Sequence, residues 1–211
     1  MTLPLRQPFA PMEALSVDTI PVGEAWRYEP KWDGFRCLAL RDGDKVELQS
    51  KSGRSMSRYF PELAAAIGKL KPRNFVLDGE IVVPVDGAFS FDALLQRIHP
   101  APSRVRKLAV ETPALLIVFD LLVGAGGERL IDKPLDERRR ALELFYQKHC
   151  RPLAHIRLSP SSTSLAKAKE WLRRTGATLD GVMAKRRDFN YRAGDRSGMQ
   201  KIKIFVAPTA S

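Results

Sequence analysis

The segment 29–36 (Glu-Pro-Lys-Trp-Asp-Gly-Phe-Arg) places a lysine, a carboxylate, a glycine and an arginine within six residues, between two alternating apolar runs. A lysine at the end of a strand that is followed at once by a turn is held rigidly and can be aimed at a ligand. The tetrapeptide Lys-x-Asp-Gly alone is a weak signal, because average residue usage produces it by chance in roughly one chain in twenty of this size. A solvated lysine beside an Asp-Gly turn explains it equally well.

Further charged residues stand inside apolar segments, where they are rare because an unpaired buried charge is costly. Five such segments hold, in order, Lys31 with Asp33, Asp78 with Glu80, Asp120, Asp180 with Lys185, and Lys201 with Lys203. Residues two apart share a face of a strand, so converging faces would form a cleft lined by carboxylates and cations. Ion pairs on the solvent side of edge strands are the alternative, and they explain one or two such segments more readily than five.

That mixture of charges suits a nucleoside triphosphate with magnesium. Cations meet the phosphates, while carboxylates hold the metal and the ribose hydroxyls. Cys37 and Cys150 stand far apart, and the three histidines are scattered, so the sequence shows no zinc-site spacing. Two unpaired cysteines are typical of free thiols in a reducing cytosol.

The composition is that of a globular protein with a basic surface. Apolar residues make up 44% and charged residues 28% of the 211 positions, and no apolar run approaches a membrane span or a signal peptide core. The formal charge of +11 favours a polyanionic partner such as nucleic acid or nucleotide. A basic protein without a specific partner is the alternative that composition leaves open.

The periodicities predict one α+β domain over 1–211, built of largely antiparallel sheet with helices packed outside, and an extended Pro-rich arm over 1–24. We expect strands over 25–31, 35–40, 46–50, 75–83, 114–122, 156–159, 179–185 and 199–205. We expect helices over 61–70, 89–98, 134–148 and 164–175. The residues 41–44 (Arg-Asp-Gly-Asp) predict a hairpin turn.

The motifs at 31–36 (KWDGFR), 78–80 (DGE), 119–120 (FD), 180–185 (DGVMAK) and 201–203 (KIK) follow in this order along the chain. This set resembles the nucleotidyltransferase motifs of ATP-dependent DNA ligases, most of all the bacterial C and D types. The segments 29–34 and 191–198 (YRAGDRSG) add to the likeness, which runs from about Met12 to Lys203. The resemblance implies an ATP-grasp-like adenylation domain.

By this resemblance, Lys31 is the nucleophile that attacks the α-phosphate of ATP, releases pyrophosphate and becomes lysyl-AMP. The attack needs a neutral amine, which is favoured by nearby cations, here Lys201, Lys203 and bound Mg²⁺ or Mn²⁺. The same cations would neutralise charge on the α-phosphate. Arginine cannot replace Lys31, because it stays protonated.

The resemblance also implies a nucleotide-binding set. Glu29 falls where the family contacts the adenine edge, Arg36 where it touches ribose or nicked DNA, and Phe119 where it stacks on the purine. Without the resemblance, Phe119 in an apolar strand is more often core. The rest of the set is Pro30, Lys51 at the place of a phosphate-binding arginine, Glu80 for ribose or metal, Asp180 for metal, and Lys185. Asp180 replaces the usual glutamate, and Asp78 is expected to brace the turn before Glu80.

The implied activity is AMP transfer to the 5′-phosphate of nicked double-stranded DNA in repair, by a monomer that is cytoplasmic, bacterial and nucleoid-associated, with no membrane contact. The family's oligonucleotide-binding (OB) domain is expected to be absent from 1–211, so these residues alone should seal nicks weakly and would act with a separate OB domain or other repair proteins. The alternatives are an RNA ligase or capping guanylyltransferase core, which shares the lysine chemistry, and a non-catalytic DNA-binding relative.

Overall fold

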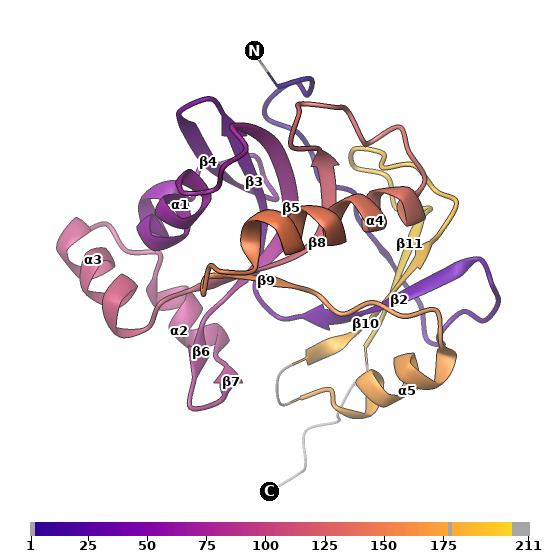
Figure 1. The fold of residues 1–211 in the computed structure, drawn as a ribbon. Coiled ribbons are helices and arrows are strands. Elements are labelled where there is room, and N and C mark those ends of the chain that lie inside the picture. The colour runs from indigo at the N-terminus through magenta and orange to yellow at the C-terminus, as the bar shows by residue number, and fades with distance from the viewer. Residues whose placement is uncertain (1–2, 177–178, 204–211) are drawn as a thin grey trace, which may run out of the picture.

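The computed structural model describes residues 3–176 and 179–203 and contains two sheets that face each other, with helices on their outer sides (Figure 1). The larger sheet has the strand order β4-β3-β5-β8-β9 and the smaller one β1-β11-β10-β2. None of the helices in this described part is long and apolar enough to cross a membrane. The architecture is the expected α+β class.

The larger sheet is antiparallel except at its last strand, where β8 and β9 run parallel. Its strands are β3 (Phe35–Asp42), β4 (Lys45–Ser50), β5 (Asn74–Val82), β8 (Leu115–Val123) and β9 (Ile156–Leu158). All nine residues of β8 are buried, which explains why its sequence is apolar at every position except Asp120. The predicted hairpin turn lies between β3 and β4, with Gly43 at a positive φ of 63°.

The smaller sheet consists of β1 (Leu15–Ser16), β2 (Trp26–Trp32), β10 (Leu179–Arg186) and β11 (Met199–Ile202). The strand predicted over 199–205 ends at Ile202, and residues 204 and 205 lie outside the described residues. The chain leaves this sheet at Trp32 and enters the larger one at Phe35, so Asp33 and Gly34 join the two sheets. A Cβ on Gly34 would lie 2.2 Å from the carbonyl oxygen of Ile81, so only glycine fits this crossing.

The helices cover the outer faces of the sheets. They are α1 (Pro61–Gly68), α2 (Phe91–Gln96), α3 (Pro102–Glu111), α4 (Leu135–Phe145) and α5 (Leu165–Arg173), with a 3₁₀ turn at Ser57–Tyr59 and a π turn at Tyr146–Cys150. Helix α4 packs on β8, while α5 packs on β2 and β10 (Figure 1). The hydroxyl of Ser90 caps α2 by accepting a hydrogen bond from the amide of Ala93.

Three elements were not predicted from the sequence: helix α3, strand β1, and a small hairpin of β6 (Pro84–Val85) and β7 (Ala88–Phe89). Helix α3 is rich in basic residues and buries only Val105, so its apolar periodicity is too weak to indicate a packed helix. Strand β1 is two residues long and depends on parallel pairing with β11, a partner far along the chain.

The N-terminal residues 3–14 contribute to the core without forming a helix. Leu3, Leu5 and Met12 are buried in a cluster with Leu38 and Leu40, on the opposite side of the larger sheet from its main core. The last of these N-terminal residues reach the space between the sheets, as described for the site below.

The charge in the buried strand β8 is neutralised internally. Asp120 is 1% exposed and receives two hydrogen bonds from Arg138 of α4, each 2.9 Å long. The remaining nitrogen of Arg138 donates to the carbonyl oxygens of Lys133 (2.7 Å) and Phe189 (3.0 Å). Asp120 therefore does not line a cleft, contrary to the expectation from its position in an apolar strand.

Replacing Arg138 by methionine should lower the free energy of unfolding by about 3–5 kcal/mol, because Asp120 is left buried without a partner. The double variant Arg138→Met/Asp120→Leu should recover more than half of that loss, since it removes both charges. Chemical denaturation measures both values. Arg140→Met, at the exposed neighbouring position, should stay within about 0.5 kcal/mol of the wild type. A loss below about 1 kcal/mol for Arg138→Met would contradict the structural role.

Candidate functional site

A cleft opens between the two sheets and holds about 850 Å³ of empty space, including its mouth. Its walls are formed by Pro11, Met12, Glu13, Ala14, Glu29, Pro30, Lys31, Trp32, Arg36, Lys51, Glu80, Phe119, Met183, Lys185, Met199 and Lys201.

The cleft brings together nine of the eleven residues that the sequence singled out, all except Asp180 and Lys203. The sequence missed the arm residues 11–14 and the two methionines, Met183 and Met199. Only the motif context of Met183 pointed towards the site, and nothing in the Pro-rich pattern of the arm places it on a cleft wall. The apolar side chains suit a flat ring, while the cations suit phosphates.

Strand pairing positions the nucleophile candidate. Lys31 lies on β2 opposite Gly181 of β10, and Glu29 lies opposite Met183, which in turn pairs with Lys201 of β11. Gly181 has φ = 136°, and a Cβ there would stand 1.9 Å from the carbonyl oxygen of Ile202. Glycine at this position lets β10 and β11 approach closely enough to hold Lys31 and Lys201 on the same cleft.

Asp180 is held by two lysines. The ammonium of Lys31 donates to Oδ2 of Asp180, and the ammonium of Lys203 lies 2.6 Å from the same oxygen. Partial burial opposes ionisation, but the hydrogen bonds from Lys203 and Lys31 prevail and lower the pKa of Asp180. Asp180 is thus an ionised partner of Lys31 in this structure, and its role as a metal ligand stays a prediction.

Glu80 has a different environment. Burial raises its pKa from the usual 4.5 to about 7, against the opposing charges of Arg36 and Lys31. Among residues 3–176 and 179–203, no group of three or more acidic, histidine or cysteine side chains is arranged to hold a metal ion. A single carboxylate on the cleft wall still fits Mg²⁺, because that ion commonly takes only one or two carboxylates and completes its shell with substrate phosphates and water.

Phe119 carries cations over its ring. The guanidinium carbon of Arg36 lies 4.7 Å and the ammonium of Lys185 4.4 Å from the ring centroid. Arg36 is fixed by two 2.6 Å hydrogen bonds to Asp78, whose Oδ2 also accepts one of 2.6 Å from the hydroxyl of Tyr191. Burial disfavours the charge, but Asp78 raises the pKa of Arg36. Asp78 thus braces Arg36.

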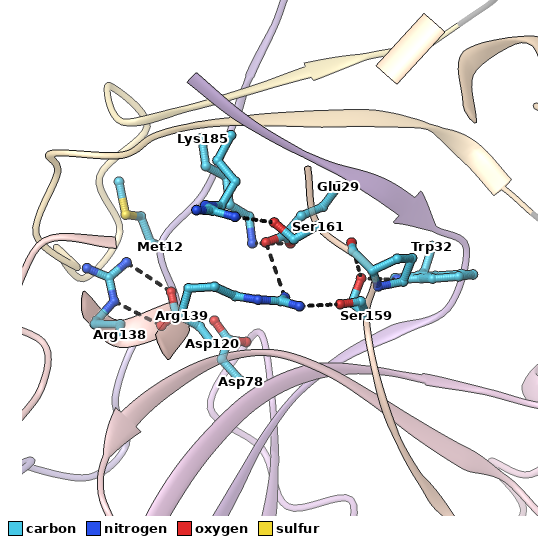
Figure 2. A network of polar contacts seen from close by, with 12 residues as sticks. Met12, Glu29, Trp32, Asp78, Asp120, Arg138, Arg139, Ser159, Ser161 and Lys185 are labelled. Atoms are coloured by element: carbon cyan, nitrogen blue, oxygen red, sulfur yellow. Dashed lines mark hydrogen bonds and ion pairs between the residues drawn. The ribbon is translucent and has the colours of Figure 1, made fainter. Parts of the chain in front are cut away.

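Glu29 lies buried at the back of the cleft between two cations (Figure 2). The ammonium of Lys185 donates to its Oε2 at 2.6 Å. On the other side, Nη1 of Arg139 lies 3.9 Å from Oε1, too far for a hydrogen bond.

Lys51 stands at the exposed rim, with 60% of its side chain accessible. Its ammonium pairs with Glu13 of the N-terminal arm at 3.1 Å, and Arg196 pairs with the same carboxylate at 2.9 Å. Lys51 lowers the pKa of Glu13, and Arg196 adds to that effect. Lys51 is therefore a long, solvent-exposed cation at the rim of the cleft. Because exposed ion pairs are weak, a phosphate can replace Glu13 as its partner.

Comparison with known proteins agrees with this geometry. A family model described as the ATP dependent DNA ligase domain matches residues 11–203. DNA ligase C of Mycobacterium tuberculosis is 47% identical over 205 residues, covering 96% of this chain and 56% of the relative. DNA ligase C2 of Mycolicibacterium smegmatis is 47% identical over 204 residues, with the same coverage.

Solved structures give the same result. A mycobacterial DNA ligase D complexed with ATP and MES superposes with a TM-score of 0.73 at 29% identity, covering 92% of this chain and 60% of that one. The ATP-dependent DNA ligase of bacteriophage T7, in complex with ATP, has a TM-score of 0.64 at 16% identity over 92% of this chain and 68% of that one, a likeness of fold alone.

The fold and the cleft are those of a nucleotidyltransferase domain. The chain belongs to the ATP-dependent DNA ligase domain family. It spans about half the length of the curated relatives it matches.

The raised pKa of Glu80 makes a prediction about stability. Because the folded state binds this proton more tightly than the unfolded state, stability falls as pH rises from about 4.5 to above 7. Glu80→Gln removes this penalty, so its free energy of unfolding relative to wild type should be about 2 kcal/mol more favourable at pH 8 than at pH 5.5. Denaturation at both pH values measures it, and an equal difference at both would refute the raised pKa.

Proposed function

We propose that Lys31 is the covalent nucleophile of an ATP-dependent adenylation. Its Nζ forms a bond to the α-phosphorus of ATP, the bond from that phosphorus to the bridging oxygen breaks, and pyrophosphate leaves. The observation that carries the proposal is the ammonium of Lys31 on the cleft wall in contact with a carboxylate, Asp180. Asp180 is in place to accept the proton that Nζ must lose.

The remaining cleft residues have roles that follow from their places. Lys201 lies on the cleft wall and belongs to β11, which pairs with β10, the neighbour of the strand that carries Lys31. It would neutralise charge on the phosphates. Phe119 lines the cleft and would stack on the purine in place of one of the two cations now over its ring, and Glu80 would meet the ribose hydroxyls or Mg²⁺. Mg²⁺, when bound, would supply charge neutralisation on the phosphates.

The polyanion that receives AMP is proposed to be nicked double-stranded DNA. The net charge of +11 supports a nucleic acid partner, and the family relatives are named DNA ligases. We further propose a monomer acting in the bacterial cytoplasm with other repair proteins. Comparing ATP with GTP as donor, and DNA with RNA ends as acceptor, separates this function from that of an RNA ligase or a capping enzyme.

Incubation with radiolabelled ATP and Mg²⁺ should give an acid-stable label and a mass increase of one AMP, mapped to Lys31. Lys31→Ala should reduce the label by at least about a thousandfold, because this variant lacks the amine that the proposal assigns to the α-phosphorus. Lys45→Ala, at an exposed position on the β3–β4 hairpin, is the matched control and should label like the wild type.

A wild-type protein that binds DNA but never forms the adducted species would instead favour a non-catalytic DNA-binding relative. Label that survives in Lys31→Ala would place the nucleophile elsewhere.

A further inference from the structure

Arg139 lies behind the cleft and has no assigned part in it. It is on α4, is 4% exposed, and does not belong to the cleft walls. Its guanidinium nevertheless reaches Glu29, which is on the smaller sheet and does line the cleft (Figure 2). The arginine before it serves the buried pair with Asp120, and the one after it, Arg140, is exposed.

The guanidinium of Arg139 is fixed by groups other than Glu29. Its Nε donates to Glu143, one turn further along α4, at 2.6 Å, and its Nη2 donates to the carbonyl oxygen of Ser159 at 2.9 Å. Two anchors on a planar group fix its position and its orientation. The charge that faces Glu29 is therefore stationary.

The two cations around Glu29 are not equivalent. Lys185 bonds directly to Oε2, while Nη1 of Arg139 stops 3.9 Å from Oε1. Within the part of the chain that the structure describes, both Oε1 and Nη1 are buried polar atoms without a hydrogen-bond partner. A buried charged oxygen without a partner is costly, and an unpaired atom of this kind on a residue of the cleft wall calls for an explanation.

We propose that Arg139 is a positioning residue that sets the base specificity of the cleft through Glu29. Its fixed charge, on the other side of the carboxylate from Lys185, holds Glu29 in one orientation, in which Oε1 is an acceptor without a hydrogen-bond partner among the described residues. A base that presents an exocyclic amine in place of a carbonyl oxygen is then favoured, because two acceptors repel. This role rests on the proposed adenylation and adds a source of its preference for adenine.

The test compares ATP with inosine triphosphate, which differs at the base by a carbonyl in place of the amine. The measured quantity is the ratio of kcat/KM for label formation with ATP to that with inosine triphosphate. In wild type this ratio should be above one. In Arg139→Gln that ratio should fall about tenfold, the size of one charge-assisted hydrogen bond, through a higher KM for ATP and with kcat little changed. Arg140→Gln is the matched control and should keep the wild-type ratio.

Arg139→Lys keeps a charge but cannot hold two anchors and face Glu29 at once, so its ratio should fall about threefold, between wild type and Arg139→Gln. The threefold fall expected for Arg139→Lys tests the proposal even if Arg139→Gln does not fold. Thermal unfolding of each variant separates an effect on stability from an effect on base specificity. A purely structural role would lower stability and leave the ratio unchanged, and an unchanged ratio in the folded Arg139 variants would overturn the proposal.

The failure of the inference can be told from failure of the adenylation itself. If wild type forms no adduct with either nucleotide, the proposed adenylation is wrong. The preference for ATP over inosine triphosphate is then measured as a ratio of binding affinities, by calorimetry on the same proteins. Equal affinities of wild type and Arg139→Gln for each nucleotide in that measurement would overturn the role of Arg139 as well.

Discussion

Charge neutralisation between packed elements is the interaction on which the rest of this structure depends. The strands that face the cleft carry charges that an apolar sheet cannot bury alone, and the most deeply buried of them are met by an opposite charge from a different element. Asp120 of β8 is met by Arg138 of α4, and Asp78 of β5 is met by Arg36 of β3. If one member of a pair is removed, the other is left as a buried charge without a partner or water. These pairs therefore fix how α4 packs on β8 and how β3 lies beside β5.

These internal pairs also separate two kinds of charged residue within the motifs. Asp78 and Asp120 are occupied by arginines and support the site from behind. Glu80 and Lys201, by contrast, reach the cleft wall. The motifs thus combine residues that contact the cleft with residues that hold those in place, although the sequence pattern marks both in the same way.

Much of the fold was predictable because its strands are long, alternate in polarity and are separated by turn residues. The nine cleft residues were predictable for a different reason, since the resemblance to the ligase motifs singled them out by their place in those motifs. Helix α3 and the short strand β1 were not, because one buries a single residue and the other is defined by a distant partner. Arg139 was beyond prediction too: on a helix with several arginines, its sequence neighbours do not show which side chain turns inward.

The crossing at Asp33 and Gly34 has a mechanical consequence. It is the shorter of the covalent connections between the two sheets, the other running from β9 through α5 to β10, and it begins two residues after Lys31. A rotation of one sheet against the other about this point would move the atoms close to it least. Lys31 would keep its distance to Arg36 and Glu80 while the far lip of the cleft widened to admit a ligand. With Lys31 as the proposed nucleophile beside the pivot, the cleft could widen without misaligning the bond that the proposed adenylation makes.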